Sequence, residues 1–195
     1  MKPIPTKYKG INFRSRLEAR WYIFMKSLGW NIEYEPHIEE LNNWLPDFLI
    51  IGKNTKVLVE VKPFSNHKDF YSDYAESTVE KIRKSNCFKR KDPSSPLINA
   101  VLIVGSSLNI GEASCGDSFM GGRIVRELDE LECIEDDFVY TDHSGKIGVC
   151  DNEISYHDPI NDDHDGGYCL RDENKEMLEL CWNKAGSQLQ WMPRC

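Results

Sequence analysis

Three charged residues lie in two neighbouring apolar segments of the first half of the chain. Asp47 stands near the start of LPDFLII, residues 45–51, and Glu60 and Lys62 lie inside KVLVEVKP, residues 56–63. Successive side chains of a strand point to opposite faces, so Glu60 and Lys62 share a face that the intervening valine does not. A hairpin that joins the two segments would bring Asp47 close to Glu60 on that face.

Carboxylates placed in this way indicate a particular chemistry. Two carboxylates at one end of a sheet repel each other, which raises the pKa of one of them. A divalent cation removes that cost, and hard oxygen ligands with bound water suit Mg²⁺ or Mn²⁺. Such an ion polarises a phosphodiester and lowers the pKa of a bound water molecule. Lys62 is then positioned to hold the attacking water or to stabilise developing charge.

Helical and extended segments alternate around these residues. Apolar residues recur at helical spacing from Arg14, and Gly29 ends that run, which predicts a helix before the two strands. WNIEYEP, residues 30–36, alternates like a strand, and GKNT suits a tight turn between the two charged strands. The next segments predicted are a helix over 67–85, a loop over 89–96 and a buried strand over 97–105.

The pattern weakens in the second half. The segments predicted there are short strands within 121–128 and 136–151, a loop at 161–167, a helix over 172–186, and a short strand or packed tail over 187–194. In that helix Met177, Leu180 and Cys181 are expected on one face, with Gly186 as the C-cap. Residues 1–13 are expected to form an extended arm. The order of elements predicts an α/β fold with a mixed central β-sheet flanked by helices and a less regular acidic C-terminal half.

Charge divides the chain into unlike halves. The 195 residues carry a net charge of −8, of which residues 1–100 hold +5 and residues 101–195 hold −13. A basic half can face a polyanion while an acidic half turns away or contacts a protein.

The first residues have no signal-peptide core, no apolar run is long enough to cross a bilayer, and the seven cysteines include no CxxC pair. We therefore expect a cytoplasmic protein without a membrane partner.

The charged residues also resemble a known motif. Pro46-Asp47 followed by Glu60-Val61-Lys62 is similar to the signature of the PD-(D/E)xK nuclease superfamily. FRSRLEARWYIFMKSLGW resembles the first helix of its phage and bacterial branch, and WNKAGSQLQW resembles that branch's C-terminal stretch. The resemblance implies a restriction-endonuclease-like core over 1–110 and an acidic extension over 111–195 packed on it. It also implies DNA as the substrate and, for a phage protein, the host cell cytoplasm as the location.

Roles for individual residues follow from the resemblance. It implies that Asp47, Glu60 and the carbonyl of Val61 bind Mg²⁺ or Mn²⁺, that Lys62 serves catalysis, and that Glu18 corresponds to a helix carboxylate of the site. From the sequence itself Glu18 has a second interpretation, because Ser15-x-x-Glu18 is a capping box. Glu60 and Lys62 likewise have an alternative as an exposed ion pair on an edge strand, worth under about 1 kcal/mol.

Further candidates remain open between binding and structural roles. Arg14, Arg16 and Arg20 either bind DNA phosphates or form a solvated helix face. The basic run from Lys81 to Lys91 either follows a nucleic-acid backbone or solubilises a helix end. Gln190 either hydrogen-bonds near the site or is a buried structural amide.

Two metal motifs and one rival function complete the expectations. The loop 161–172 has acidic residues near calcium-binding positions, and Cys150, His157, His164 and Cys169 have no established zinc spacing, so a polar turn and free side chains are favoured. Cys115 lacks a neighbouring base in the sequence.

The alternative to a nuclease is an inactive nuclease scaffold that binds a host or phage protein through its acidic segment 127–173. The sequence leaves open whether the DNA is single- or double-stranded, whether cutting is internal or from an end, and the oligomeric state.

Overall fold

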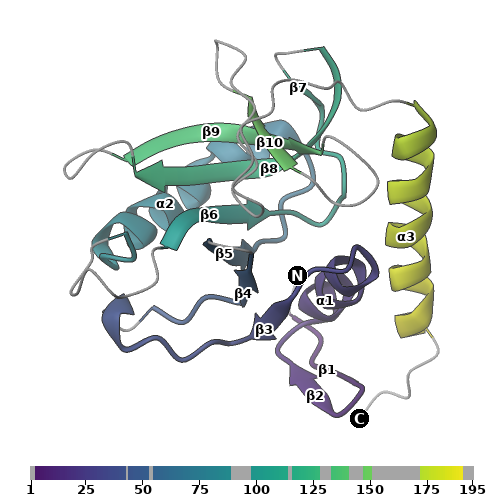
Figure 1. Ribbon diagram of the computed structural model, residues 1–195, viewed down its shortest axis with the longest axis horizontal. Coiled ribbons are helices and arrows are strands. Elements are labelled where there is room, and N and C mark those ends of the chain that lie inside the picture. Colours follow the sequence, from purple (N-terminus) through teal and green to yellow (C-terminus); the bar gives the residue numbers. More distant parts are fainter. Residues whose placement is uncertain are drawn as a thin grey trace.

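The computed structural model describes residues 3–42, 44–52, 55–88, 98–113, 116–127, 133–140, 147–150 and 172–190, and for 40, 112–119, 127, 133–140, 147–150, 172–174 and 190 the backbone alone. Its centre is a mixed sheet in the strand order β10-β9-β8-β6-β5-β4-β3, with β7 paired to β8. Strands β5 and β6 are parallel, and the other pairs are antiparallel. Helices α1 and α3 cover one face of the sheet and α2 covers the other (Figure 1). The predicted α/β fold with a mixed, helix-flanked sheet is confirmed.

The chain begins with a hairpin where an extended arm was expected. Strands β1 (Thr6–Tyr8) and β2 (Ile11–Phe13) pair antiparallel. The turn between them places Lys9 at φ 45° and Gly10 at φ 85°, and the glycine meets no steric cost there. The expectation missed this pairing because three-residue strands leave almost no alternation to detect.

Helix α1 (Arg16–Ser27) lies where helical spacing placed it. The Ser15 hydroxyl caps it by accepting the backbone N–H of Glu18 at 3.1 Å, and Gly29 follows its end at φ 81°. The helix buries Trp21 and Phe24 against the sheet. The predicted start and stop of this helix are confirmed.

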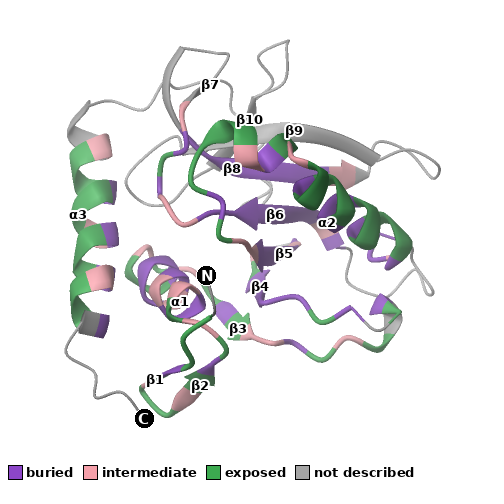
Figure 2. Cartoon of the chain, turned by 180° about the vertical axis from the view of Figure 1, so that it is seen from behind, coloured by how far each residue is buried: buried purple, intermediate pink, exposed green. Residues whose placement is uncertain are grey.

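Four strands form the part of the sheet that carries the charged residues. They are β3 (Ile32–Tyr34), β4 (Phe48–Ile51), β5 (Lys56–Val61) and β6 (Ile98–Val104). Gly52 donates its N–H to the Thr55 carbonyl at 2.9 Å, which closes the turn between β4 and β5, and residues 53–54 lie outside the described residues. Strand β6 is buried on both faces, as its continuous apolar run predicts, and Figure 2 shows the buried centre.

The helix expected over 67–85 is divided in two. A 3₁₀ helix, η2 (His67–Tyr71), precedes α2 (Asp73–Lys84). Ser72 adopts an extended backbone between them, and its hydroxyl accepts the Ala75 N–H at 3.3 Å as the N-cap of α2. The prediction of one helix was wrong because the spacing of apolar residues continues through the break. A second short 3₁₀ turn, η1 (Glu39–Leu41), lies between β3 and β4.

The second half adds strands to the same sheet. Strands β7 (Glu112–Ala113), β8 (Gly116–Glu127), β9 (Cys133–Tyr140) and β10 (Ile147–Cys150) follow β6. Strand β8 pairs with β6, so residues on both sides of position 110 belong to one sheet. The predicted loops at 89–96 and 161–167 lie outside the described residues.

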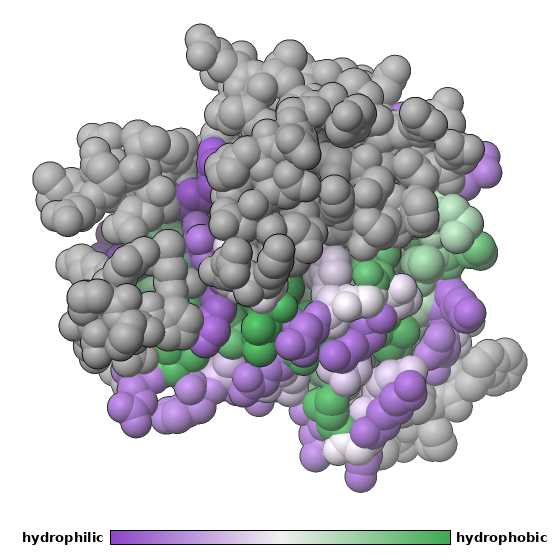
Figure 3. All heavy atoms as spheres, in the orientation of Figure 1, coloured by the Kyte–Doolittle hydropathy of each residue, from purple (hydrophilic) through white to green (hydrophobic). Residues whose placement is uncertain are grey.

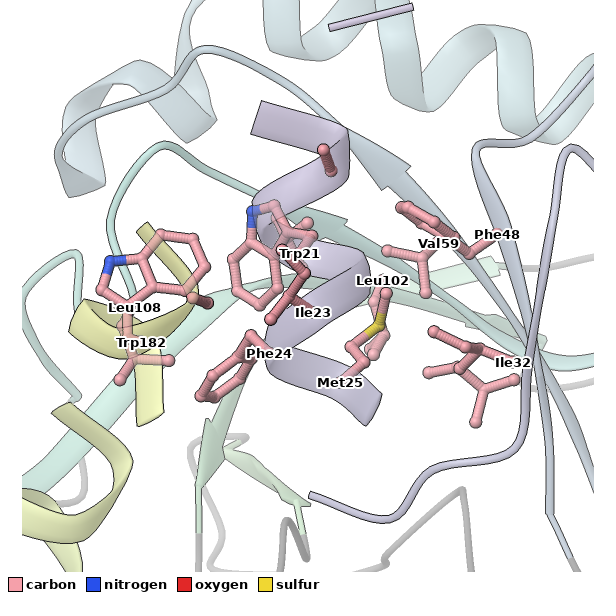
Figure 4. Packing of buried hydrophobic residues seen from close by; sticks show 14 of the residues in the cluster. Trp21, Ile23, Phe24, Met25, Ile32, Phe48, Val59, Leu102, Leu108 and Trp182 are labelled. Carbon is pink, nitrogen blue, oxygen red and sulfur yellow. The ribbon is translucent and has the colours of Figure 1, made fainter. Parts of the chain in front are cut away.

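Helix α3 (Asp172–Gln190) is longer than expected and turns a different face to the core. Leu178, Trp182, Ala185 and Leu189 are buried, whereas Met177 and Leu180 are 48% and 60% exposed. Figure 4 shows Trp182 beside Trp21 and Phe24 of α1, and the two tryptophan ring centroids are 4.7 Å apart.

Gly186 lies within α3 and does not end it. A Cβ added there would stand 3.1 Å from the Arg20 guanidinium carbon, so the glycine allows α1 and α3 to approach. The predicted C-cap was wrong, because a glycine late in a helical segment can mark either the end of the helix or a close contact with another helix. Residues 187–190 continue the helix, and 191–195 lie outside the described residues.

The surface of the described chain is of mixed character. Hydrophilic and hydrophobic residues are interspersed over the described part of the face drawn in Figure 3. Among the helices of the described residues, none combines the length and the apolar character that a membrane crossing needs.

Candidate active site

Asp47 and Glu60 meet at one end of the β4–β5 hairpin. Phe48 pairs with Val59 in the register, and one residue further Asp47 stands opposite Glu60. The two residues are only 4% and 5% exposed. Burial, followed by the charge of Glu60, raises the pKa of Asp47 to about 7. Two buried carboxylates therefore interact unfavourably at this point of the sheet.

Asp47 is held from two sides. Its Oδ2 accepts the backbone N–H of Val61 at 2.6 Å, and its Oδ1 accepts a hydrogen bond from the Arg14 guanidinium. The Val61 bond ties the end of β4 to β5 through a side chain. The carboxylate is therefore fixed in place before any ligand binds.

Glu60 also has both oxygens engaged. Lys62 donates from Nζ to Oε1 at 2.6 Å, and Trp44 donates from its indole nitrogen to Oε2 at 3.2 Å. Although burial alone would lower the pKa of Lys62, the adjacent Glu60 carboxylate raises it above its usual value. Lys62 is therefore a cation at neutral pH and cannot act there as a base. Because β5 lies between β4 and β6, the alternative of an exposed pair on an edge strand is wrong.

Glu18 takes part in capping the start of α1, and its carboxylate is held by neighbouring groups. It is 7% exposed at the start of α1, and its backbone N–H completes half of the capping box with Ser15. Its Oε2 accepts hydrogen bonds from the Tyr34 hydroxyl at 2.7 Å and from the backbone N–H of Arg14 at 3.1 Å. The carboxylate of Glu18 thus binds the N–H of Arg14, where a regular capping box would use the N–H of Ser15. Its charge also contributes to the raised pKa of Asp47, which places Glu18 near the pair.

Arg14 and Glu35 form an ion pair that joins the site to β3. Arg14 donates from Nε to Glu35 Oε1 at 2.8 Å while its Nη2 binds Asp47. Glu35 has φ 48°, an uncommon conformation for a residue with a side chain, and its N–H binds the Asp47 carbonyl at 2.9 Å. Glu35 and Trp44 were not predicted from the sequence, because neither position in the sequence shows what its side chain faces.

The other arginines of α1 do not join this group. Arg20 packs its guanidinium 3.8 Å from the Trp182 ring centroid and donates to the Trp182 carbonyl at 3.1 and 3.2 Å. Burial lowers the pKa of Arg20. Its contacts hold α1 to α3, and its contact with DNA phosphates stays a prediction. Arg16 is exposed at the first position of α1.

An open cavity lies beside Trp44. It has a volume of about 420 Å³, and its lining comprises Asn42, Trp44, Ser77, Glu80, Lys81, Lys84 and Ser85. Lys84 pairs with Glu80 at 3.0 Å. The first part of the predicted basic run therefore lines this cavity, and Lys89, Arg90 and Lys91 lie outside the described residues.

Among the described side chains, no group of three or more histidine, cysteine, aspartate or glutamate residues is arranged to hold a metal ion. The remaining oxygen donors are Asp47, Glu60 and the carbonyl of Val61, which ends β5. The two buried carboxylates repel each other, and a divalent cation would offset that repulsion. Hard oxygen ligands of this kind, with water molecules completing the coordination shell, suit Mg²⁺ or Mn²⁺.

Several expected residues have no described side chain. The calcium-like loop 161–172, the possible zinc residues and Cys115 fall outside the described side chains, as does the acidic segment 127–173. Gln190 is described only as the last residue of α3.

Comparison with known proteins adds nothing to this geometry. No family model, no curated protein and no solved structure matches the chain. The chemistry of the site is therefore argued from its own residues.

Proposed function

We propose that this protein is a metal-dependent nuclease that hydrolyses phosphodiester bonds in DNA. The observation that carries the proposal is the buried Asp47–Glu60 pair at the end of a hairpin, with the cationic Lys62 bound to Glu60 at 2.6 Å. A buried pair of carboxylates is costly unless a cation offsets it. The β3–β4–β5 meander followed by parallel β6 supports a restriction-endonuclease-like core as part of the same proposal.

The proposed mechanism assigns a task to each residue. Asp47, Glu60 and the Val61 carbonyl hold Mg²⁺ or Mn²⁺, with Glu18 supporting the site from α1. The ion supplies polarisation of the phosphate and a lowered pKa for a bound water molecule. Lys62, protonated at neutral pH, donates hydrogen bonds to the attacking water or to the charge that develops on the phosphate oxygens.

Arg14 has two tasks in this scheme. It neutralises Asp47 while no ion is bound, through the contact between its guanidinium and Oδ1. The Arg14 guanidinium, which is already half exposed, would be repelled by a divalent cation held at that carboxylate. Arg14 would then bind a phosphate of the DNA.

The test is a cleavage assay with Mg²⁺ and Mn²⁺ on linear, circular, single-stranded and branched DNA. Asp47→Asn and Lys62→Met should each remove most cleavage, because one loses a metal ligand and the other loses the positive charge. Glu33→Gln, an exposed change on neighbouring β3, is the matched control and should cleave as the wild type does. Cleavage by Asp47→Asn at the wild-type rate would overturn the mechanism.

A second function is favoured by one observation. Both carboxylates already have internal cations, Arg14 and Lys62, as expected of a nuclease scaffold that no longer binds metal. Such a protein would instead bind a host or phage protein through its acidic segment 127–173. Mn²⁺ titration separates the two functions, since a real site gives a rise in melting temperature that Glu60→Gln abolishes. No shift with any divalent ion would favour the binding protein.

A further inference from the structure

Three exposed aromatic side chains lie on η2 and the first turn of α2, and one of them, Tyr74, lies near Lys62. Tyr71 is 45% and Tyr74 is 55% exposed, and His67 is exposed as well. The Lys62 Nζ is 6.0 Å from the centroid of the Tyr74 ring, and the His67 and Tyr71 rings are 4.8 Å apart. We call His67, Tyr71 and Tyr74 the aromatic shelf, which begins at the proposed catalytic lysine and extends over η2 and the first turn of α2.

Buried residues hold the shelf from beneath. Phe64 contacts Tyr74 edge to face at 5.7 Å between ring centroids. Arg123, only 4% exposed, places its guanidinium carbon 4.7 Å from the Tyr71 ring centroid and donates to the Phe70 carbonyl at 3.0 Å. The tyrosine rings are therefore oriented by the core while much of their surface remains open to solvent.

The loop that leads into the shelf is also fixed. The Asp69 carboxylate accepts the Ser65 N–H at 2.7 Å, the Ser65 hydroxyl at 2.9 Å and the Asn66 amide at 3.1 Å. Glu76 accepts from Arg123 at 2.8 Å. The carboxylates of Asp69 and Glu76 are thus engaged in contacts within the protein.

Open, oriented rings next to a phosphate-binding group suit one kind of ligand. Nucleobases stack on aromatic side chains with little regard to sequence, because every base has a π face. In a duplex the bases stack on one another, so only unpaired bases present that face. The Lys62 Nζ lies 6.0 Å from the centroid of the Tyr74 ring. A base attached to a phosphate bound by Lys62 is therefore within reach of that ring.

We propose that the aromatic shelf stacks unpaired nucleobases, so that the substrate is single-stranded or locally unpaired DNA. This inference rests on the proposed nuclease function and assigns its substrate class. It also predicts that intact duplex DNA contacts the protein without using Tyr71 and Tyr74.

The experiment measures DNA binding with cleavage prevented. Glu60→Gln protein is titrated into a labelled oligothymidylate and into a blunt duplex of the same length, and binding is followed by fluorescence anisotropy. Adding Tyr71→Ala and Tyr74→Ala should weaken single-strand binding by about five- to 150-fold for each base that stacks, the loss that about 1–3 kcal/mol of stacking per base corresponds to. Duplex binding should stay unchanged.

Two controls separate stacking from folding. Tyr71→Phe with Tyr74→Phe retains both rings and should bind the single strand as the parent does. Leu180→Ala removes an exposed apolar side chain on α3 and should also change nothing. The melting temperature of each variant verifies that it is folded.

The outcomes distinguish this inference from the nuclease proposal. If the folded double alanine variant binds the single strand as the parent does, the shelf is not a base-stacking site, and a protein contact becomes the better interpretation. If single-strand binding depends on the two rings but wild-type protein cleaves no DNA, the nuclease proposal falls and the stacking site stands. If the parent binds no DNA, both are overturned.

Discussion

At the scale of single residues, the negative charge of buried Asp47 lowers the stability of the folded protein. The same charge favours the binding of a cation. Its pKa is about 7 in the folded protein, mainly because of burial and Glu60, and about 4 in an unfolded chain. The folded state therefore binds more protons than the unfolded state between these values. Stability falls as the pH rises from about 4 to 7, and the full cost remains above pH 7. A binding site often carries such a cost, which its ligand then offsets.

The first prediction concerns Asp47→Asn. The amide oxygen still accepts the Val61 N–H, while the buried charge is gone. At pH 8 without metal, the variant should melt at least about 3 °C above the wild type, the shift that about 1 kcal/mol produces in a chain of this size. At pH 5 most of the difference should disappear, because Asp47 is then protonated. Calorimetry at the two pH values measures both, and a lower melting temperature at pH 8 would contradict the electrostatic account.

The second prediction concerns Arg14. Its guanidinium binds Asp47 and lies 3.9 Å from Glu18, so it repels a divalent ion at the same carboxylates. Arg14→Gln should therefore bind Mn²⁺ about tenfold more tightly in calorimetric titration, an effect of the size that a nearby unit charge exerts. Arg16→Gln, exposed two residues further along the chain, is the control and should bind as the wild type does. Weaker binding by Arg14→Gln would show that the arginine supports the ion.

At the scale of elements, local signals define the ends of α1 but misplace the ends of other helices. Ser15 and Gly29 mark α1 because its caps are local hydrogen bonds and a local left-handed residue. Ser72 divides the helix expected over 67–85, although the apolar spacing runs through it. Gly186 is a residue type that often ends a helix, but here its missing side chain allows α3 to pack closely against Arg20 of α1. A glycine in the sequence therefore indicates either free backbone or close packing, and only the neighbouring element decides which.

The third prediction tests that contact through Gly186→Ala. Alanine raises helix propensity by about 1 kcal/mol over glycine in a helix interior. Here its Cβ would lie 3.1 Å from the guanidinium of Arg20, which the Trp182 ring and carbonyl hold in place. The variant should therefore gain no stability and should melt below the wild type. Ser187→Ala, exposed on the next position of α3, is the control and should be neutral or slightly stabilising. A melting temperature of Gly186→Ala above that of the wild type would show that Arg20 yields.

At the scale of the whole molecule, the last helix completes the core of the first half of the chain. Trp182 joins Trp21 and Phe24 in one cluster, with ring centroids 4.7 and 5.5 Å away. The same cluster reaches Val59 and Leu102 in the sheet that carries the site. The packing behind the site therefore depends on residues distant in sequence.

The fourth prediction follows from this packing. Trp182→Ala should destabilise the protein by about 3–5 kcal/mol, because it leaves a large cavity between α1 and α3. Leu180→Ala on the exposed face of the same helix should change stability by at most about 0.5 kcal/mol. Urea unfolding of both variants measures the difference. Equal effects would contradict the observed orientation of α3.

The sequence alone determined the parts of this protein that depend on local periodicity. Alternation in residues 56–63 and the short turn before them suffice to place Asp47 opposite Glu60, because a hairpin leaves few registers. Capping signals and helical spacing likewise suffice for α1. The mixed sheet follows from the order of the elements.

Only the tertiary structure decided which residues surround that pair. Glu35, at a left-handed backbone position, pairs with Arg14 of the site, and Trp44, between two strands, donates to the Glu60 carboxylate. Neither residue has a periodic signal. Arg20, in the second turn of α1, contacts α3, whereas Arg14, just before the N-cap of the same helix, contacts Asp47. The face of α3 was set by its partner, since several apolar stripes on one helix are equally periodic. Contacts between distant segments depend on shape and distance in three dimensions, and the spacing of residues along one segment carries no record of them.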